Sequence, residues 1–385
     1  MLTILQIVPE LEAGGVERTT VDIAAAIVAG GGKAIVVSQG GRLEGELAQT
    51  GAELIKLPVA SKNPAKILRN ASALERILRE RHISIIHARS RAPAWSAYFA
   101  ARATRTPFIT TYAGSYKHTG PFKKFYNSIM ASGDIVIANS QYTADQIAAA
   151  YKIKASKLII IPRGSDFAAL DREAVAPERV AQMKSSWGLA AHLGPIILLP
   201  GRLTRWKGQG LLIEAMKLLE EQGRLWNAAA VLAGDAQGRE AYVAELEYSV
   251  QSAGLSDRIR IVGHIEDMPA AYAASTLVVS ASTEPEAFGR IAVEASAMGV
   301  PVIASDHGGA RETVIVEPEN ARTGWRFAPG NADSLAQAIA QAFELPRTEL
   351  QAIGIAAAAF VRRRYSLQAM CRATLQAYLR AVDRQ

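Results

Sequence analysis

The chain has 385 residues, of which 49% are hydrophobic and 21% charged, a soluble globular composition with enough length for two domains. Its formal net charge is +7, but no nucleic-acid-binding motif accompanies the excess, so an anionic substrate or surface is the expected partner rather than nucleic acid. The single cysteine, Cys371, excludes an internal disulfide framework and favours a reducing compartment.

Short apolar segments alternate with helical segments along the whole chain, a pattern typical of α/β domains with parallel sheets. The N-terminus has no basic stretch and no cleavage site, so we expect a first strand there and not a signal peptide. No apolar run approaches the ~18 residues that span a bilayer, and we expect a cytoplasmic protein with possible peripheral contact on the inner face of the cytoplasmic membrane. Strands are predicted at 3–8, 34–38, 53–57, 84–88, 108–111, 135–138 and 158–161, and helices at 16–29, 64–81 and 92–103.

The second half repeats this alternation after a segment of different character. Residues 166–194 carry mixed charge and no clear strand, so we expect the linker there. Further strands are predicted at 195–199, 228–233, 259–262, 277–280 and 300–304, and a last helix at 367–382. The expected organisation is a Rossmann-like domain over 1–180, a second over 181–362, and a C-terminal helix within 363–385.

Two acidic side chains of the second half stand in a setting that suits a ligand. Glu286 and Glu294 lie eight positions apart, on a predicted loop and on the helix expected at 288–298. Carboxylates accept hydrogen bonds from hydroxyl groups, and the free amides at a helix start favour phosphate. The pair therefore indicates a nucleotide-sugar site, with two solvated acids on a surface helix as the alternative.

The same stretch resembles a known family. Glu286-x7-Glu294, the following Ala-x-Ala-Met-Gly-Val-Pro-Val-Ile-Ala and Gly308-Gly309-x-x-Glu312 are similar to glycosyltransferase family 4. The resemblance implies the GT-B fold, in which two Rossmann-like domains face each other across a cleft and the C-terminal helix packs back on the first. It also implies a retaining, metal-independent hexosyltransferase with a UDP- or GDP-sugar donor and no cofactor. We expect a glycan or lipid-linked acceptor, in lipopolysaccharide or other cell-envelope polysaccharide synthesis.

A basic loop follows the first predicted strand of the second half. Gly201, Arg202 and Lys207 lie in a Gly-Arg-Leu…Lys-Gly segment that matches the family, where these side chains bind the donor diphosphate. An arginine can hold a phosphate through two hydrogen bonds, and fixed cations stabilise the charge that develops on a leaving group. Arg205 has no such match and is expected to be solvated. An exposed basic turn is the alternative for the whole loop.

The resemblance implies roles for further residues. Glu294 would bind the donor ribose and Glu286 the transferred sugar, so the expected catalytic set is Arg202, Lys207 and Glu286. Gly14-Gly15 does not form the dinucleotide fingerprint of hydride-transfer enzymes, and a structural turn is its alternative. His264, which precedes Ile265, is equally well explained as a capped loop histidine. The expected donor-binding residues are Gly14, Gly15, Gly201, Ile265, Ala287, Phe288, Gly289 and Glu294.

The chain departs from the family pattern at one position. A histidine that contacts the reacting sugar is common there, but this chain has Ala113, and His118 follows five residues on. In the family's proposed route an oxygen of the leaving phosphate takes the acceptor proton, so either the role of the histidine is dispensable or another group supplies it. The enzyme then contributes positioning and charge stabilisation.

Basic side chains are concentrated in residues 61–124, which hold thirteen Lys and Arg but two Glu and no Asp. Arg89 and Arg91 follow a predicted strand and are expected at the edge of the cleft, where they and His118 would bind acceptor phosphates or carboxylates. A solvated basic face is the alternative. Three lysines among aromatic residues are expected to meet anionic lipid headgroups: Lys117, Lys123 and Lys124.

Two other functions fit parts of the pattern. A sugar-nucleotide epimerase could use the same fold, whereas a phosphorylase would need a pyridoxal-phosphate lysine motif that the sequence lacks. A non-catalytic protein that binds anions through its basic surface is the alternative outside the enzymes. The scattered histidines and the absence of an Asp-x-Asp pair favour a metal-independent site.

Overall fold

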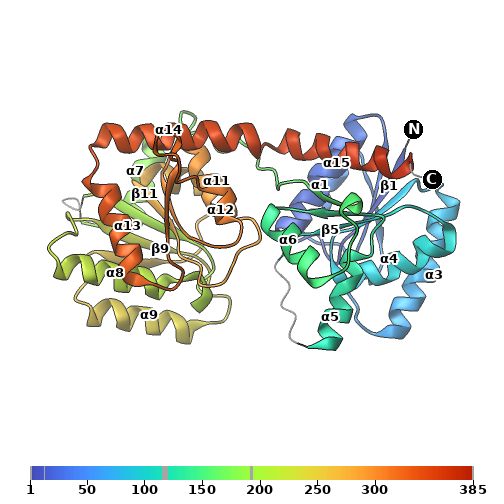
Figure 1. Cartoon of the computed structure of the whole chain (residues 1–385), viewed down its shortest axis with the longest axis horizontal. Coiled ribbons are helices and arrows are strands. Elements are labelled where there is room, and N and C mark those ends of the chain that lie inside the picture. Colours follow the sequence, from blue (N-terminus) through green and yellow to red (C-terminus); the bar gives the residue numbers. More distant parts are fainter. Residues whose placement is uncertain (1, 13, 115–119, 191–193, 384–385) are drawn as a thin grey trace. The chain divides into compact units, whose positions relative to one another are not determined.

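A computed structural model describes residues 2–12, 14–114, 120–190 and 194–383. The chain forms two compact units, Met1–Gly164 with Leu367–Gln385, and Ser165–Ser366 (Figure 1). None of the helices within the described ranges has both the length and the apolar character needed to cross a membrane.

The boundary between the units differs from the predicted one. The first unit ends at Gly164, whereas the sequence indicated a boundary at residue 180 and a linker around it. The described residues of this segment form no strand, but Leu170, Val175 and Trp187 are buried in the core of the second unit. A polar segment with a few well-spaced apolar side chains is thus anchored by burying them, and it belongs to the second unit.

The first unit contains a parallel sheet with the strand order β3-β2-β1-β4-β5-β6-β7. In its register Leu5 lies opposite Ile35 on one side and Ile86 on the other. Such central strands are covered on both faces, which explains their nearly continuous apolar sequences. The strands are β1 (Thr3–Ile7), β2 (Lys33–Ser38), β3 (Glu53–Lys56), β4 (Ile85–Ala88), β5 (Phe108–Tyr112), β6 (Ile135–Ala138) and β7 (Leu158–Ile160).

Successive side chains of these strands enter two different cores. Leu5 and Ile7 pack with side chains of α3 and α4, whereas Ile4 packs with side chains of α1 and α15. The helices of this unit are α1 (Gly15–Ala29), α2 (Glu44–Gln49), α3 (Pro64–Glu80), α4 (Arg91–Thr104), α5 (Pro121–Ser128), α6 (Gln141–Ala150), α15 (Leu367–Val382) and the short 3₁₀ helices η1 (Ile129–Ala131) and η2 (Ala155–Lys157).

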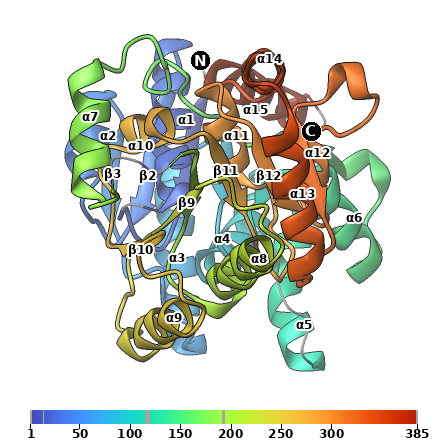
Figure 2. The ribbon, with the colours of Figure 1, turned by 90° about the vertical axis from the view of Figure 1, so that its left-hand side faces the viewer.

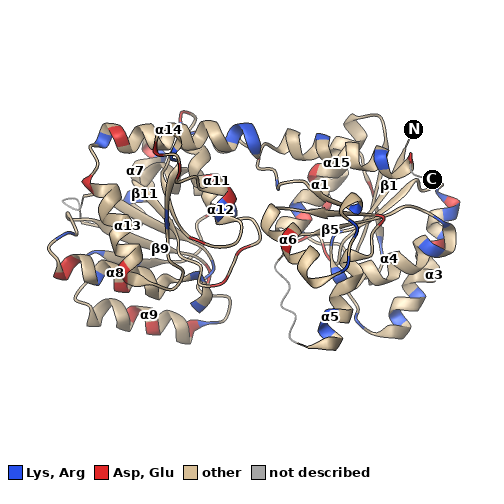
Figure 3. Ribbon diagram, in the orientation of Figure 1, with Lys and Arg blue, Asp and Glu red and all other residues tan. Residues whose placement is uncertain are grey.

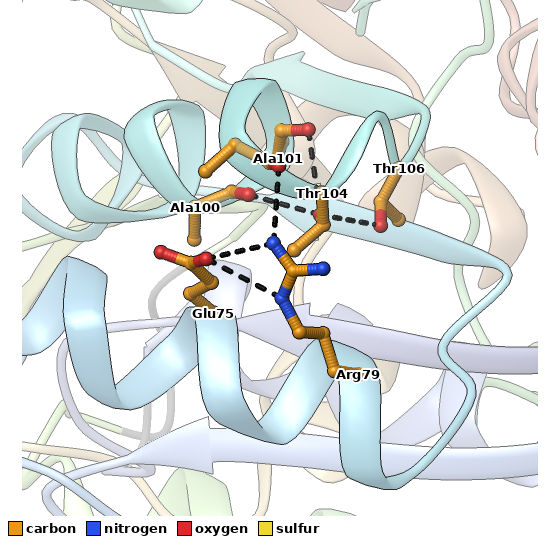
Figure 4. Close-up of polar contacts among 7 residues, drawn as sticks. Glu75, Arg79, Ala100, Ala101, Thr104 and Thr106 are labelled. Carbon is orange, nitrogen blue, oxygen red and sulfur yellow. Dashed lines mark hydrogen bonds and ion pairs between the residues drawn. The ribbon is translucent and has the colours of Figure 1, made fainter.

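Helices α3 and α4 are tied together by polar contacts as well as apolar ones (Figure 4). Arg79 of α3 pairs with Glu75 at 2.8 Å and donates to the carbonyl oxygen of Ala103 at 3.3 Å. The carbonyl groups in the last turn of a helix lack partners within it, and a cation there also complements the helix dipole. The Thr104 hydroxyl bonds back to the Ala100 carbonyl at 2.9 Å.

The second unit contains a parallel sheet with the strand order β10-β9-β8-β11-β12-β13. The edge strand β13 was not predicted, because its four residues begin with glycine and include Arg326. The strands are β8 (Ile196–Pro200), β9 (Ala229–Ala233), β10 (Ile259–Val262), β11 (Leu277–Ser280), β12 (Val302–Ser305) and β13 (Gly324–Phe327).

Helices lie on both faces of the second sheet (Figure 2). Ile197 and Leu199 pack with α8, α9 and α13, whereas Ile196 and Leu198 face α10 and α11. The helices are α7 (Pro177–Ser186), α8 (Gln209–Glu221), α9 (Glu240–Ser252), α10 (Met268–Ala274), α11 (Arg290–Ala297), α12 (Ala310–Thr313), α13 (Ala332–Glu344), α14 (Arg347–Arg364), with η3 (Arg205–Lys207) and η4 (Glu319–Ala321).

Each sheet reverses its strand order beside its first strand. The chain runs from β1 to β3 in one direction and from β4 to β7 in the other, and it does the same from β8 to β10 and from β11 to β13. Ligands of open α/β sheets bind at the carboxyl ends of the strands at such switch points. The predicted α/β class with two doubly wound sheets is confirmed, and it directs attention to the loops after β1, β4, β8 and β11.

Candidate functional site

The loops after β8 and β11 meet at the switch point of the second sheet. Gly208 has a φ of 75°, and a Cβ atom there would overlap the carbonyl oxygen of Ala281. Glycine thus lets the two loops touch, and the amide of Thr283 donates to the carbonyl oxygen of Trp206 at 2.7 Å. The loops carrying Lys207 and Glu286 are therefore held in fixed register.

Lys207 and Glu286 form an ion pair across these loops. The Nζ–Oε1 distance is 2.7 Å, and only 12% and 19% of the two side chains are exposed. Lys207 Nζ also lies 4.5 Å from the centre of the Trp206 ring. Partial burial makes this pair less screened than a surface pair, and each partner compensates the other's loss of hydration.

Glu286 is also held by groups that the sequence analysis did not identify. The Ser282 hydroxyl donates to its carboxylate, and the amide of Gly309 donates to its carbonyl oxygen at 2.8 Å. His307 Nε2 lies 2.8 Å from the carbonyl oxygen of Ser282. A side chain at Gly308 would overlap the Glu286 backbone, which explains the physical need for the Gly-Gly pair recognised in the sequence.

Glu294, on α11, has two partners of its own. Arg290 donates to one carboxylate oxygen from the preceding turn, and the Tyr272 hydroxyl donates to the other at 3.1 Å. Burial and then the neighbouring Glu294 raise the pKa of Tyr272 well above its usual value, so its proton stays available for this bond. Tyr272 comes from α10, and its sequence position gave no sign of this contact.

The two arginines of the basic loop have different surroundings. Arg202 is exposed, and within the described ranges no carboxylate pairs with it. Arg205 is exposed as well, but it pairs with Glu245 and lies over the Tyr242 ring. The guanidinium N–H groups of Arg202 are therefore available to an anion. Those of Arg205 are bound to Glu245 on the surface of α9.

The remaining donor-site residues offer mainly backbone groups. Helix α11 begins at Arg290, two residues later than predicted, so Phe288 precedes it; its side chain is buried against Tyr365. Gly289 is the N-cap with a φ of 80° and no side-chain cap, and Ala287 lies two residues ahead of it. Ile265 is half-buried in the same core, and His264 beside it is exposed.

Gly201 and Gly234 bring two other strand ends together. Gly201 has a φ of 149°, which favours glycine. A side chain at Gly234 would overlap the carbonyl oxygen of Gly201. The amide of Leu203 donates to the carbonyl oxygen of Asp235 at 3.1 Å. The turn after β9 therefore supports the basic loop.

In the first unit the predicted acceptor residues are only partly brought together. Gly14 is the N-cap of α1, and Gly15 opens that helix. Arg91, at the start of α4, donates to the Asn127 side chain at 2.8 Å. Arg89 was expected at an exposed edge, but it is buried with 4% of its surface exposed. His118 lies outside the described residues.

Arg89 is buried because the residues around it form a polar network inside the unit. Its Nε donates to Gln6 Oε1 at 2.8 Å. Nearby His87 bonds through Nδ1 to the Tyr378 hydroxyl and through Nε2 to the Thr111 hydroxyl, both at 2.7 Å. Burial, and then the charge of Arg89, hold the pKa of His87 well below its usual value. The sequence gave no sign of this network, because Tyr378 comes from the last helix.

Metal ligands were also sought in the described part of the chain. No group of three or more His, Cys, Asp or Glu side chains there is arranged to hold a metal ion.

Comparisons with known proteins identify the family. The model of Glycosyltransferase Family 4 matches residues 13–168, and that of Glycosyl transferases group 1 matches residues 189–359. A glycosyltransferase from Rickettsia africae has 36% identity and a TM-score of 0.90, with 100% of this chain and 99% of that chain covered. Anabaena HepE, solved with UDP-glucose, has 26% identity and a TM-score of 0.79, with 98% and 100% covered.

Curated relatives match over a shorter part. A GDP-mannose-dependent α-(1-6)-phosphatidylinositol monomannoside mannosyltransferase from Mycolicibacterium smegmatis is 29% identical, over 58% of this chain and 56% of that protein. The chain spans about half the length of the curated relatives it matches. Because the family models together cover most of the chain and the Rickettsia structure matches all of it, the chain belongs to glycosyltransferase family 4 and has the GT-B fold.

Proposed function

We propose that the chain is a retaining, metal-independent hexosyltransferase that moves a sugar from a nucleotide-diphosphate donor to a glycan or lipid-linked acceptor. We place its role in lipopolysaccharide or other cell-envelope polysaccharide synthesis. The observation that carries the proposal is the half-buried pair of Lys207 and Glu286 at the switch point of the second sheet. A fixed cation for a leaving phosphate and a fixed carboxylate for sugar hydroxyls stand there side by side.

The proposed chemistry divides the work among four side chains. Lys207 and Arg202 stabilise the negative charge that collects on the diphosphate as the glycosidic bond to it breaks. Glu286 accepts hydrogen bonds from the transferred sugar, and Glu294, fixed by Tyr272, accepts them from the donor ribose. The acceptor hydroxyl gives its proton to the departing phosphate, so Ala113 in place of a histidine is compatible with turnover.

The donor class is supported by two relatives. HepE is solved with UDP-glucose, and the name of the mycolicibacterial relative specifies GDP-mannose. A UDP- or GDP-hexose is therefore the proposed donor. Ile265 and its neighbours after β10 would contact the base through their backbone, and Gly14 and Gly15 would approach the donor phosphate.

The metal-independent part of the proposal rests on the two cations of the basic loop. Arg202 and Lys207 supply the positive charge that a divalent metal would otherwise bring to the diphosphate. Chelation with EDTA should leave the turnover rate unchanged. A strict requirement for added Mg²⁺ or Mn²⁺ would contradict this part alone.

We also propose contact between the first unit and an anionic membrane through α5. Phe122 and Phe125 stand one helical turn apart with 90% and 67% of their surfaces exposed, and Lys123 and Lys124 lie between them. The Phe125 ring also packs against half-buried Trp95, with 5.3 Å between the ring centres. Lys and Arg residues also mark α3 of the same unit (Figure 3). Exposed aromatic rings beside lysines suit an anionic interface.

The test of the proposed function is release of nucleoside diphosphate from UDP-, GDP- and ADP-sugars, combined with thermal-shift measurements. One donor should raise the melting temperature by mass action and release its nucleoside diphosphate. An epimerase would convert the sugar nucleotide without that release. A non-catalytic anion-binding protein would show neither release nor conversion, and either result would refute the proposal.

A further inference from the structure

Lys207 has two different partners in the proposed reaction. In the structure its Nζ binds the Oε1 atom of Glu286 at 2.7 Å, and the proposed chemistry also assigns Lys207 to the leaving diphosphate. A diphosphate carries more negative charge than one carboxylate, so it attracts the ammonium group more strongly. The restraint that Lys207 places on Glu286 is therefore weakest when the diphosphate is bound. A donor that does not respond to the diphosphate would keep the carboxylate in position.

The Ser282 hydroxyl is such a donor. Ser282 is buried, with 3% of its surface exposed, and its hydroxyl donates to the same Oε1 atom of Glu286. Because the hydroxyl carries no net charge, a bound diphosphate does not draw it away. Among the described residues no hydrogen bond reaches Oε2 of Glu286. The protein thus holds one carboxylate oxygen, and the lone pairs of the other remain for hydroxyl groups of a sugar.

His307 and Gly309, from the loop after β12, hold the backbone on both sides of this contact. Nε2 of His307 lies 2.8 Å from the carbonyl oxygen of Ser282. A carbonyl oxygen can only accept, so Nε2 carries the proton and donates it. The amide of Gly309 donates to the carbonyl oxygen of Glu286 at 2.8 Å. The loop after β12 therefore fixes the segment from Ser282 to Glu286 at its two ends.

A small cavity beside Glu286 explains why its carboxylate needs such a restraint. The residues that line the cavity include Glu286, Ser280, Ser305 and His307. The Ser305 hydroxyl is buried and has no hydrogen-bond partner among the described residues. A carboxylate released by Ser282 would therefore find both space and an unused donor in the cavity. Small displacements of a group that orients a reacting substrate reduce the rate by large factors.

We propose that Ser282 and His307 are positioning residues of the donor site. His307 fixes the backbone of Ser282, and the Ser282 hydroxyl keeps Glu286 in place when the diphosphate engages Lys207. The inference rests on the proposed function, in which Glu286 binds the transferred sugar. Both residues act through Glu286, so their effect falls on sugar transfer rather than on nucleotide binding.

The test compares the turnover of the whole chain with its affinity for the nucleoside diphosphate. Ser282→Ala removes a hydrogen bond to a charged group, and kcat should fall about 10- to 100-fold. The dissociation constant of the nucleoside diphosphate should stay at the wild-type value, because no nucleotide contact is removed. Ser282→Thr keeps a hydroxyl and should restore most of the turnover. Ser296→Ala, at a buried serine of α11, is the matched control and should keep the wild-type kcat.

His307 is tested with two amide side chains of different length. Glutamine places an amide N–H group near the position of Nε2, whereas asparagine is too short to reach it. His307→Gln should therefore keep most of the turnover, and His307→Asn should lower kcat about fivefold at unchanged affinity for the nucleoside diphosphate. Equal kcat in these two variants would overturn the role of His307.

A double-variant cycle separates this proposal from the proposed function. In the Glu286→Ala background, Ser282→Ala should cause little further loss of kcat, because Ser282 acts through Glu286. Wild-type kcat in Glu286→Ala would contradict the role of Glu286 in the proposed function. A low kcat in Glu286→Ala with wild-type kcat in Ser282→Ala would overturn the positioning proposal alone. Equal losses of kcat and of nucleoside diphosphate affinity in Ser282→Ala would also overturn it, since they would indicate damage to the whole site.

Discussion

The two switch points of this chain differ in how their charged side chains are arranged. In the second sheet, Lys207 pairs with Glu286 and Arg290 with Glu294, so each of these two carboxylates has a cation beside it. In the first sheet, the pocket beside β1 and β4 is lined by Arg89 and Arg163 and by no carboxylate of the described residues. A matched site can present both charges at fixed positions to a ligand with hydroxyls and phosphates.

This difference has an energetic consequence for mutations. Removing one partner of a half-buried ion pair leaves the other charge without compensation. A single substitution at Lys207 or Glu286 should therefore lower the stability of the site by more than the free energy of the contact itself. Arg89 has no carboxylate partner among the described residues, but its Nε donates to Gln6 Oε1, so replacing it would leave that amide oxygen without its donor.

Loss of Lys207 should have the largest effect on activity. Lys207→Ala removes a fixed charge from the leaving diphosphate, and turnover should fall about 10²- to 10³-fold, or ~2.7–4 kcal/mol. Steady-state kinetics with a saturating donor measure the change. Arg205→Ala on the same loop is the matched control, because Arg205 pairs with Glu245, and it should retain turnover. Similar losses in both variants would mean that the loop, and not the Lys207 charge, is needed.

Glu286→Gln should lower turnover more than it weakens binding of the nucleoside diphosphate. A charged acceptor is replaced by a neutral one of the same size, for an expected loss of about 1.5–3 kcal/mol in kcat/KM. In the Lys207→Ala background the further loss should be smaller, because the two side chains are coupled. Independent, additive losses would show that the pair does not act as a unit.

The first unit should lose stability in mild acid through His87. The pKa of His87 is well below 6.5 in the folded chain because of burial, so the unfolded chain binds the proton first as pH falls. This contribution is complete above pH 6.5 and declines below it, by up to about 1.4 kcal/mol per pH unit. Urea unfolding at pH 7, 6 and 5 should show the decline, and His87→Gln should remove it. His82→Asn, at an exposed histidine of the same unit, should keep the wild-type slope.

Charge reversal on α5 should have a smaller effect, a reduced binding of the chain to anionic membranes. Wild-type chain should float with anionic vesicles at low salt and not with neutral ones. Lys123→Glu with Lys124→Glu should reduce the bound fraction, since each lysine near the surface contributes about 1 kcal/mol. Lys152→Glu with Lys154→Glu reverses two exposed lysines elsewhere in the unit and serves as the control. The membrane proposal fails if neutral vesicles bind equally well or if both double variants behave alike.

Much of the fold could be predicted, because parallel strands buried on both faces leave continuous apolar segments such as β8 and β9. The short edge strand β13, with glycine and arginine in its four residues, carries no such signal. The first unit ends at Gly164 and not near residue 180, and this was not predictable because anchoring by three spaced apolar side chains does not show in a polar sequence.

The site was predictable where it depends on local spacing. Glycines and charged residues directly follow β8, β11 and β12, and this local spacing is visible in the sequence. The loops they form meet at one switch point of the sheet. Partners from distant elements were not predictable. Tyr272 reaches Glu294 from another helix, and Tyr378 from the last helix helps to enclose Arg89. Burial of Arg89 follows from that tertiary packing, and its sequence neighbours alone suggested an exposed position.

The proposed binding site of the donor nucleotide is the switch point of the second sheet, where Lys207 pairs with Glu286. Calorimetric titration of UDP and GDP into wild type, Glu294→Gln and the exposed control Glu214→Gln tests it most directly. One nucleotide should bind wild type and the control equally, and about tenfold more weakly to Glu294→Gln, because a charge-assisted hydrogen bond to the ribose is lost. Unchanged affinity in a folded Glu294→Gln protein would contradict the account.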